Sequence, residues 1–283
     1  MTRQHPVDGA GLGLRRALLG SLSSVPTQQV QFMEVAPENW INVGGRYGRA
    51  FREYSEKFPF VLHGLSLSIG SPSPLDWQLL KNIKAFMAEH QIDFYTEHLS
   101  YCSDSGHLYD LMPIPFTSAA VDYVVDRISQ IQDFLGQRIA MENVSYYAAP
   151  QQEMSELDFT CAVLEKADCN LLLDVNNIYV NSINHGYDAQ TFLQGLPGER
   201  IVYGHIAGHY EEAADLRVDT HGADVIDPVW GLLRLAYQQF GVFPTLLERD
   251  FNLPPITDLL EEVAMIRTIQ QTCEAQEAVA YDV

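Results

Sequence analysis

Short apolar runs alternate with longer amphipathic segments from one end of the chain to the other. The runs are nearly continuous in Val, Ile, Leu and Phe, which is typical of strands buried on both faces of a parallel sheet. The segments between them carry apolar residues at helical spacing, as at Val124, Ile128 and Ile131. Strands are predicted at residues 9–14, 30–35, 58–62, 92–96, 138–145, 169–177, 201–203 and 243–250. Helices are predicted at about 75–90, 118–134, 154–166, 229–240 and 256–272, and a long loop at 99–117.

This order of elements predicts a single (β/α)8 barrel of the TIM type, because eight strand–helix units follow one another without a sustained linker. We expect one domain over residues 1–283, with the barrel at about 9–272 and a short flexible C-terminal tail. An open doubly wound sheet is the alternative, and it would need a glycine-rich phosphate loop after the first strand. The segment GAGLG is glycine-rich, but Arg15 and Arg16 lie where helix amides would meet a pyrophosphate.

Acidic residues outnumber basic ones by 37 to 17, which gives a formal net charge of −20. Nucleic-acid binding needs clustered Lys and Arg, so this balance argues against a nucleic-acid partner. The four cysteines form no CxxC pair, and we expect free, mostly buried thiols in a reducing compartment. Neither a signal peptide nor an apolar stretch of membrane-spanning length is apparent, so a cytoplasmic protein without membrane contact is expected.

The predicted strands end in carboxylates and imidazoles. In a β/α barrel the carboxyl ends of the strands meet at one mouth, where the chemistry of such folds takes place. Buried charges are costly without partners, and few Arg or Lys residues follow these strands. Metal ions allow many carboxylates to share a small volume, and His, Asp and Glu without converging Cys suit iron, manganese or zinc. The ligand candidates are His63, His98, Glu142, Asp174, His205, Asp219, His221 and Glu248.

The number of candidates indicates more than one ion. A mononuclear site with open positions uses about three or four protein ligands, so eight candidates imply two or three ions bridged by carboxylates. A mononuclear site and a metal-free polar mouth remain as alternatives. Glu34 and Glu38 could bind metal or hold an arginine. Weaker candidates for contacts with substrate or with the ligands are Arg15, Glu34, Glu38, Asn143, His209 and Arg249.

Nine motifs in register carry a family resemblance: GLGLR, FMEVAPENW, LHGLSLSIG, EHLSY, MENVSYY, LLDVNNIYVN, HIAGH, VDTHG and LLERD. Over about residues 9–270 the chain resembles the MbnB-like multinuclear non-heme iron-dependent oxidative enzymes. The resemblance implies a β/α barrel with two or three irons in mixed Fe(II)/Fe(III) states and O2 as cosubstrate. It also implies a cysteine-containing, ribosomally made precursor peptide as substrate, with an oxazolone–thioamide, thiooxazole or related product. A separate partner protein that recruits the peptide is expected.

The same resemblance places the eight candidates on metal-ligand positions of the family and Asn177 in a segment that contributes to a third metal. Glu142, Asp174 and His205 are expected to be catalytic, and Arg15 or Arg249 could meet the peptide. Two other functions stay open. One is a divalent-metal isomerase or hydrolase of the xylose-isomerase or endonuclease-IV kind, and the other is a non-catalytic metal-binding protein.

Overall fold

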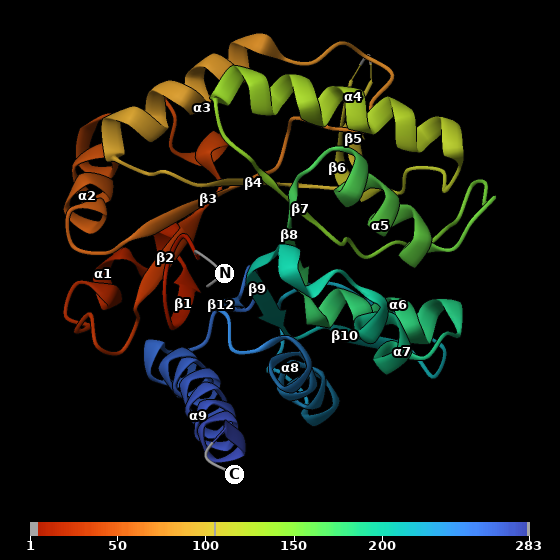
Figure 1. Ribbon diagram of the computed structural model, residues 1–283. Coiled ribbons are helices and arrows are strands. Elements are labelled where there is room, and N and C mark those ends of the chain that lie inside the picture. The colour runs from red at the N-terminus through yellow and green to blue at the C-terminus, as the bar shows by residue number, and fades with distance from the viewer. Residues whose placement is uncertain (1–4, 105, 282–283) are drawn as a thin grey trace.

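The eight predicted strands pair in parallel and close into a barrel, with helices around the outside (Figure 1). The structure, a computed structural model, describes residues 5–104 and 106–281. The first strand pairs with both the second and the last, so the sheet has no open edge, and the predicted TIM-type class is confirmed. The barrel strands are β1 (Ala10–Gly13), β2 (Phe32–Val35), β3 (Phe60–Gly64), β4 (Tyr95–His98), β7 (Ala140–Glu142), β8 (Asn170–Asp174), β9 (Ile201–Ala207) and β12 (Thr245–Glu248).

Capping side chains fix where several of the surrounding helices begin. Asp76 accepts hydrogen bonds from two amides of the first turn of α3, and Thr117 and Ser155 cap α4 and α5 in the same way. Gly136 and Gly186 end α4 and α6 with the left-handed backbone that glycine adopts at low cost. The helices are α1 (Leu19–Leu22), α2 (Gly45–Ser55), α3 (Trp77–His90), α4 (Ser118–Leu135), α5 (Glu156–Lys166), α6 (Val175–His185), α7 (Ala189–Gly195), α8 (Asp227–Phe240) and α9 (Ile256–Tyr281), with short 3-10 turns η1 (Arg16–Leu18), η2 (Pro37–Asn39) and η3 (Gly198–Arg200).

The inside of the barrel has an apolar layer below a polar one. Side chains two residues apart on a strand face the same way, so six of the strands contribute one residue to each layer. The lower layer is a buried cluster that includes Phe32, Val61, Ala140, Leu172, Tyr203 and Leu246. Two residues further along the same six strands lie Glu34, His63, Glu142, Asp174, His205 and Glu248, all buried. The apolar layer therefore closes the barrel beneath the mouth and keeps the polar layer away from water.

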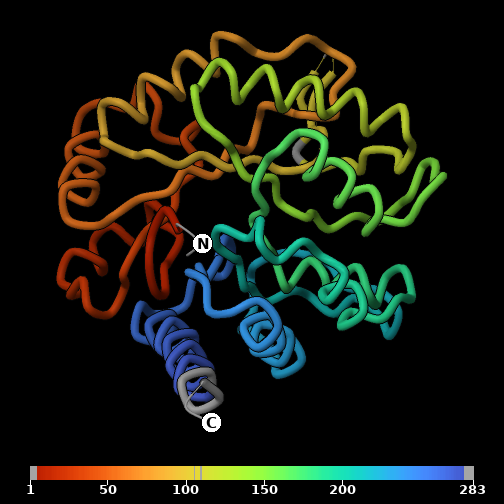
Figure 2. The backbone as a smooth tube through the Cα atoms, in the orientation of Figure 1, coloured from red at the N-terminus to blue at the C-terminus, as the bar shows by residue number. Residues whose placement is uncertain are grey.

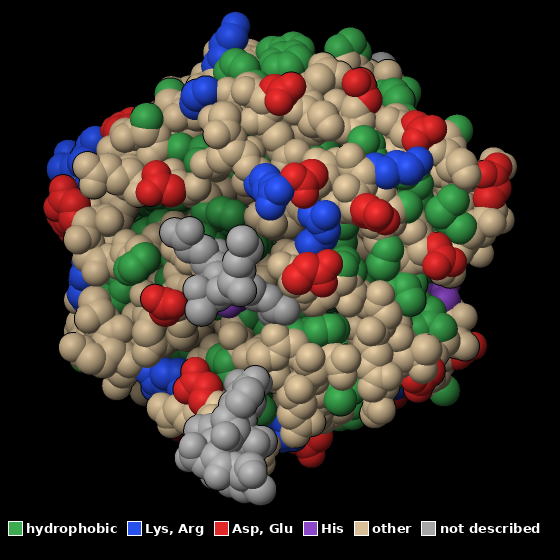
Figure 3. Space-filling model, in the orientation of Figure 1, with side chains coloured by type: hydrophobic (Ala, Val, Ile, Leu, Met, Phe, Trp, Pro, Cys, Tyr) green, Lys and Arg blue, Asp and Glu red, His purple; other side chains and the backbone are tan. Residues whose placement is uncertain are grey.

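The first and last elements of the chain meet. Figure 2 follows the chain once around the barrel, and α9 packs beside β1. The face of the molecule in Figure 3 carries acidic and basic side chains interspersed, without a broad patch of one sign. Among the described residues, no helix is long and apolar enough to cross a lipid bilayer. The four cysteines are thiols and not disulfides, and Cys102, Cys169 and Cys273 are buried, as expected.

Several predicted boundaries were wrong. Strand β9 continues through Gly204, where a side chain would lie 2.8 Å from the Phe243 ring, so this glycine permits close packing and does not end the strand. The predicted loop at 99–117 contains the hairpin β5 (Tyr101–Ser103) and β6 (His107–Met112), and a second hairpin, β10 (Tyr210–Ala213) and β11 (Leu216–Val218), follows β9. The expected flexible tail after residue 272 is instead helical to Tyr281, because this segment is rich in Ala, Glu and Gln and has no Gly or Pro.

Candidate metal centre

The mouth of the barrel brings together all the residues that the sequence predicts as ligands. Most come from strand ends, and the others come from the start of α6 and from the segment that follows β11. Their ligand atoms form groups in which nitrogen and oxygen atoms lie close together and point inward. Two of the groups share the carboxylate of Glu142.

The first group joins His63, His98 and Glu142. The Nε2 atoms of the two imidazoles are 3.1 Å apart, and Glu142 Oε2 lies 3.3 Å from His63 Nε2 and 3.1 Å from His98 Nε2. The opposite ring nitrogens are held from behind, by Thr96 Oγ1 at 2.7 Å and by the Gly64 carbonyl at 2.9 Å. A carbonyl only accepts, so His98 carries its proton on Nδ1 and turns the Nε2 lone pair into the mouth. Ligands about 2 Å from a common ion are about 3 Å from one another, which fits this group.

The second group centres on His205. Its Nε2 donates to Glu34 Oε2 at 2.8 Å, which leaves Nδ1 as a lone-pair donor. This Nδ1 lies 3.0 Å from Glu248 Oε2, 3.3 Å from Glu142 Oε1 and 4.0 Å from Asp174 Oδ2. Two of these atoms, His205 Nδ1 and Asp174 Oδ2, are buried and have no hydrogen-bond partner among the described residues. The four ligand atoms therefore surround a point that no protein group fills.

The third group lies around His221. The Nδ1 atom contacts Asp250 Oδ2 at 3.2 Å, and Nε2 lies 2.7 Å from Asp219 Oδ1 without hydrogen-bond geometry. The Oδ1 atom of Asn177 is also buried without a hydrogen-bond partner among the described residues. Its amide nitrogen donates to the Asn143 carbonyl. His221 has a φ of 49°, a left-handed conformation that costs a residue other than glycine about 1–3 kcal/mol.

His221 could also use its other nitrogen as a ligand. His221 Nδ1, Glu248 and Asp250 lie close enough to hold an ion. However, Asp250 is already occupied by Arg15, whose Nε donates to Oδ1 at 2.7 Å, and His221 Nδ1 is hydrogen-bonded to the same carboxylate. We therefore favour Nε2, which has no hydrogen-bond partner among the described residues, as the ligand atom.

These unpartnered atoms test whether a metal fits. A buried polar atom without a partner carries a desolvation cost, and such atoms are rare unless an ion or water completes the site. Four occur at this mouth, namely Asp174 Oδ2, Asn177 Oδ1, His205 Nδ1 and His221 Nε2. All four are ligand types for iron, manganese or zinc, so the residues fit a multinuclear metal centre.

Crowding of carboxylates and imidazoles at the mouth shifts the pKa values of several predicted ligands. Burial and the charges of Glu142 and Asp219 raise the pKa of Asp174 well above its usual range. Burial alone would lower the pKa of His98, but the carboxylates of Glu142 and Glu97 raise it to about 9. Burial opposes ionisation of Glu142 as well, yet the imidazoles of His63 and His98 lower its pKa. Protons thus offset the crowded carboxylates, and cations would replace these protons.

Polar side chains behind the ligands fix their orientation. His209 Nδ1 contacts Asn176 Oδ1 at 2.8 Å, and the Asn176 amide donates to Asp219 Oδ1 at 2.8 Å, so His209 acts on the mouth through two residues. The Asn143 side-chain amide donates to the Asp174 carbonyl and accepts from the Asp174 backbone N–H, at 2.9 Å each. In this arrangement Asn143 and His209 act on the predicted ligands through hydrogen bonds.

Arg249 was a weaker candidate for contact with the substrate or the ligands, and the structure places its side chain away from the ligand groups. Its side chain is 3% exposed and pairs with Asp224 and Glu262 on the outside of the barrel. The preceding residue, Glu248, faces inward, so the alternation along the strand turns Arg249 outward. Arg15 reaches the mouth, where its Nε and Nη2 pair with Asp250 and Glu248.

Glu97 is a buried acid at the mouth that the ligand predictions left out. It accepts hydrogen bonds from the Tyr95 hydroxyl at 2.8 Å and from the Leu67 amide at 3.2 Å. Glu38 holds the same loop and no arginine, since it accepts from the amides of Leu65 and Ser66 at 2.8 and 3.0 Å. Burial and the neighbouring Glu97 raise the pKa of Glu38 to about 6. Both acids hold the loop after β3, and Glu97 also lies beside a predicted ligand, because its Oε1 is 3.5 Å from His98 Nδ1.

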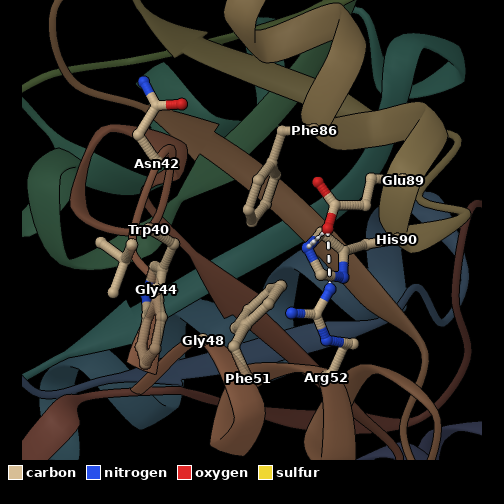
Figure 4. A pocket seen from close by; sticks show the side chains of 10 residues that line it. Trp40, Asn42, Gly44, Gly48, Phe51, Arg52, Phe86, Glu89 and His90 are labelled. Atoms are coloured by element: carbon tan, nitrogen blue, oxygen red, sulfur yellow. Dashed lines mark hydrogen bonds and ion pairs between the residues drawn. The ribbon is translucent and has the colours of Figure 1, made fainter. Parts of the chain in front are cut away.

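A separate pocket lies outside the barrel between α2 and α3 (Figure 4). It has a volume of about 220 Å³ and aromatic walls that include Trp40, Phe51 and Phe86. Arg52 and Glu89 form an ion pair at 2.9 Å beside it. The pocket includes none of the predicted ligands, so it is not part of the candidate metal centre.

The fold and the mouth together define a TIM-barrel protein with buried His, Glu and Asp clusters that could bind metal ions. The chain belongs to the family of RiPP precursor modification enzymes MbnB/TglH/ChrH, which matches residues 9–271. This confirms the family expected from the nine motifs and identifies an enzyme family that modifies precursors of ribosomally made peptides.

Close relatives span nearly the whole chain. A UPF0276 protein of Alcanivorax borkumensis is 62% identical over 284 residues, covering 96% of this chain and 94% of its own length. The UPF0276 protein PA3283 of Pseudomonas aeruginosa is 55% identical over 265 residues, covering 94% and 93%.

Solved structures with the same barrel are much more distant in sequence. An L-ribulose 3-epimerase matches with a TM-score of 0.61 and 13% identity, over 96% of this chain and 98% of that one. Endonuclease IV from Thermus thermophilus matches with a TM-score of 0.57 and 14% identity, over 95% and 100%. At such identities the likeness shows the fold alone.

Proposed function

We propose that the protein is a multinuclear iron-dependent oxidase that uses O2 to modify cysteine residues of a ribosomally made precursor peptide. The observation that carries the proposal is the position of Glu142, whose two carboxylate oxygens face different groups of ligand atoms. Oε2 faces His63 and His98, and Oε1 faces His205. A carboxylate in this position is suited to bridge two ions, and membership of the peptide-modifying family supports a peptide substrate.

The proposed ligands are His63, His98, Glu142, Asp174, Asn177, His205, Asp219, His221 and Glu248. Iron bound by them would supply the redox change and the open coordination positions that O2 and a cysteine thiolate require. In the overall reaction the cysteine residue loses hydrogen, and O2 accepts the electrons and protons. The same barrel could serve a divalent-metal isomerase or hydrolase, but the family match favours peptide modification.

The residues of the chain have distinct tasks in this proposal. Glu34 keeps the proton of His205 on Nε2, so that Nδ1 is available as a ligand. Asn143 holds the backbone of Asp174, the residue whose side chain also caps α6 through the Asn177 amide at 2.6 Å. The buried apolar layer beneath them excludes water, which limits side reactions of an oxidising site.

Substitution of the bridging carboxylate tests the function. Glu142→Gln removes the charge that faces both groups, so we expect bound iron to fall at least twofold and thiol-dependent O2 consumption to be lost. Iron is measured by elemental analysis, and O2 uptake with a cysteine-containing peptide from the same gene neighbourhood. Glu89→Gln, on the outer surface, is the matched control and should keep both properties.

Two outcomes would refute the proposal. Full O2 consumption by an iron-depleted Glu142→Gln protein would show that the site is not needed. A wild-type protein that binds zinc or manganese, lacks O2 uptake and converts a sugar or a phosphodiester would support the isomerase or hydrolase alternative.

A further inference from the structure

The β10–β11 hairpin lies beside the candidate metal centre and has an open edge. Within the described part of the chain, β10 pairs only with β11, and all four of its residues are exposed. β11 packs against α6 on the other side. Because β10 has no second strand partner in the described part of the chain, alternate backbone N–H and C=O groups on its outer edge can pair with an extended peptide, although the Ala213 carbonyl already accepts from Arg217.

The hairpin is connected to the predicted ligands at both ends. Residue His209, which precedes β10, contacts Asn176, and Asp219 follows directly after the last residue of β11. Tyr210 of β10 is opposite Val218 of β11 in the ladder. Neighbouring strands are about 4.8 Å apart, so a peptide strand added at Tyr210 would lie about 10 Å from the chain at Asp219. A cysteine a few residues beyond such a strand could reach the mouth.

The charge of the hairpin favours one kind of peptide. Glu211, Glu212 and Asp215 are exposed, and Arg217 is largely buried, where it pairs with Glu211 at 3.3 Å and binds backbone carbonyls. The surface that an added strand would meet is thus acidic, and it attracts Lys and Arg side chains. The side chains of Tyr147 and Tyr210 are exposed, and the Tyr147 hydroxyl accepts from the Asp219 amide at 2.9 Å.

We propose that the precursor peptide binds as an added β-strand on the outer edge of β10, with basic residues next to its target cysteine. This inference rests on the proposed function for the identity of the ligand as a peptide substrate. An acidic edge strand with a bulge between Glu211 and Ala213 also protects against self-association. The two roles differ in a measurable way, because protection alone gives no affinity for a basic peptide.

Peptide binding to the iron-loaded protein tests the proposal without turnover. The probe is a fluorescent peptide of about a dozen residues with one central cysteine and lysines at alternate positions. Glu212→Lys combined with Asp215→Lys reverses two exposed charges and leaves the Glu211–Arg217 pair intact. We expect binding to weaken about tenfold, and the wild-type affinity to fall with added salt. The same charge change on the outer surface of α2, Glu53→Lys with Glu56→Lys, should alter binding less than twofold.

A second peptide separates strand addition from charge attraction alone. N-methylation at alternate residues keeps the lysines but removes the amides that pair with an edge strand, so we expect at least tenfold weaker binding. Equal binding of the methylated peptide, or equal loss in both double variants, would overturn the proposal. If the protein consumes O2 with a thiol peptide and the hairpin variants consume it equally, only this inference fails. If iron and O2 consumption are absent while the basic peptide still binds to β10, the proposed oxidase function fails instead.

Discussion

At the scale of single residues, the predicted ligand histidines have one ring nitrogen held by the protein and the other directed into the mouth. His205 illustrates the consequence, because Glu34 accepts from its Nε2 at 2.8 Å and also accepts from the Tyr203 hydroxyl at 2.7 Å. Such a carboxylate fixes the tautomer and makes the imidazole a better ligand.

Glu34→Gln should therefore weaken metal binding without removing a proposed ligand. We expect iron affinity to fall about 10- to 100-fold, the usual range for a lost partner behind a ligand. The measurement is iron retained after dialysis against graded chelator concentrations. Glu38→Gln changes a buried acid that holds a loop and should retain wild-type iron. Unchanged retention in Glu34→Gln would mean that Glu34 does not orient His205.

The sequence predicted which residues reach the mouth because carboxylates and imidazoles follow the apolar runs at the carboxyl ends of the strands, even where the exact strand boundary was wrong. It did not reveal which way each side chain faces, since a shift of one residue turns a side chain to the other side of the sheet. Arg249 was misplaced for this reason, and the buried Glu97 was overlooked beside His98. Asp250 pairs with Arg15, which is distant in the sequence, so residue spacing could not predict this contact.

At the scale of elements, α6 holds the segment that follows β7. Asn181, fully buried in α6, accepts from the Tyr146 amide and donates to the Val144 carbonyl and to Glu156. This segment also carries Ser145, whose hydroxyl donates to Asp219 Oδ2 at 2.9 Å. Asn181 thus holds the segment whose Ser145 hydroxyl binds the proposed ligand Asp219.

Asn181→Ala should leave buried polar groups without partners. Each unsatisfied group costs about 1–3 kcal/mol, so we expect the free energy of unfolding to fall by about 3 kcal/mol. Iron bound through Asp219 should fall as well, which urea denaturation and elemental analysis measure in parallel. Asn82→Ala removes an exposed hydrogen bond to Gln78 and should change neither quantity. A stable variant with full iron would contradict this role.

Glu156 gives the same region a dependence on pH. Burial raises its pKa to about 7, against hydrogen bonds from Tyr146 and Asn181 that lower it. The folded protein therefore holds this proton more tightly than the unfolded chain does. Its contribution to stability is complete below the ordinary value of 4.5 and is lost as the pH rises to about 7.

We expect Glu156→Gln to remove this loss. Relative to the variant, metal-free wild type should lose roughly 2 kcal/mol between pH 5 and pH 8, a value reduced for the partial exposure of the residue. Urea denaturation at several pH values gives the difference in the free energy of unfolding between the two proteins. The contributions of the other titrating groups cancel in this difference. A constant difference across this range would rule out a raised pKa for Glu156.

The helices and barrel strands were predictable because their periodicity extends over many residues. The hairpins were not, since β5 and β11 have only three residues each, which is too short for a recognisable alternation. The C-terminal end of α9 was missed for a different reason. An amphipathic pattern ends near residue 272, but intrinsic helix propensity continues the helix to Tyr281.

At the scale of the whole molecule, the barrel concentrates its acidic charge where the strands end. Without cations, this arrangement is maintained by protons, as the raised pKa of Asp174 shows; burial is its largest cause, followed by the charge of Glu142. Bound metal would relieve both the repulsion and the unpartnered ligand atoms, so stability and metal binding should be coupled.

Removal of iron should therefore lower the thermal midpoint of the protein. A ligand present at about 100 times its Kd adds about 2.7 kcal/mol, which corresponds to roughly 5–10 °C for a chain of this size. Differential scanning calorimetry before and after chelation measures the shift, and readdition of Fe(II) should restore it. In His205→Ala, which lacks a proposed ligand, chelation should shift the midpoint much less. An equal shift in both proteins would place the stabilising metal elsewhere, and no shift in wild type would mean that the mouth is stable with protons alone.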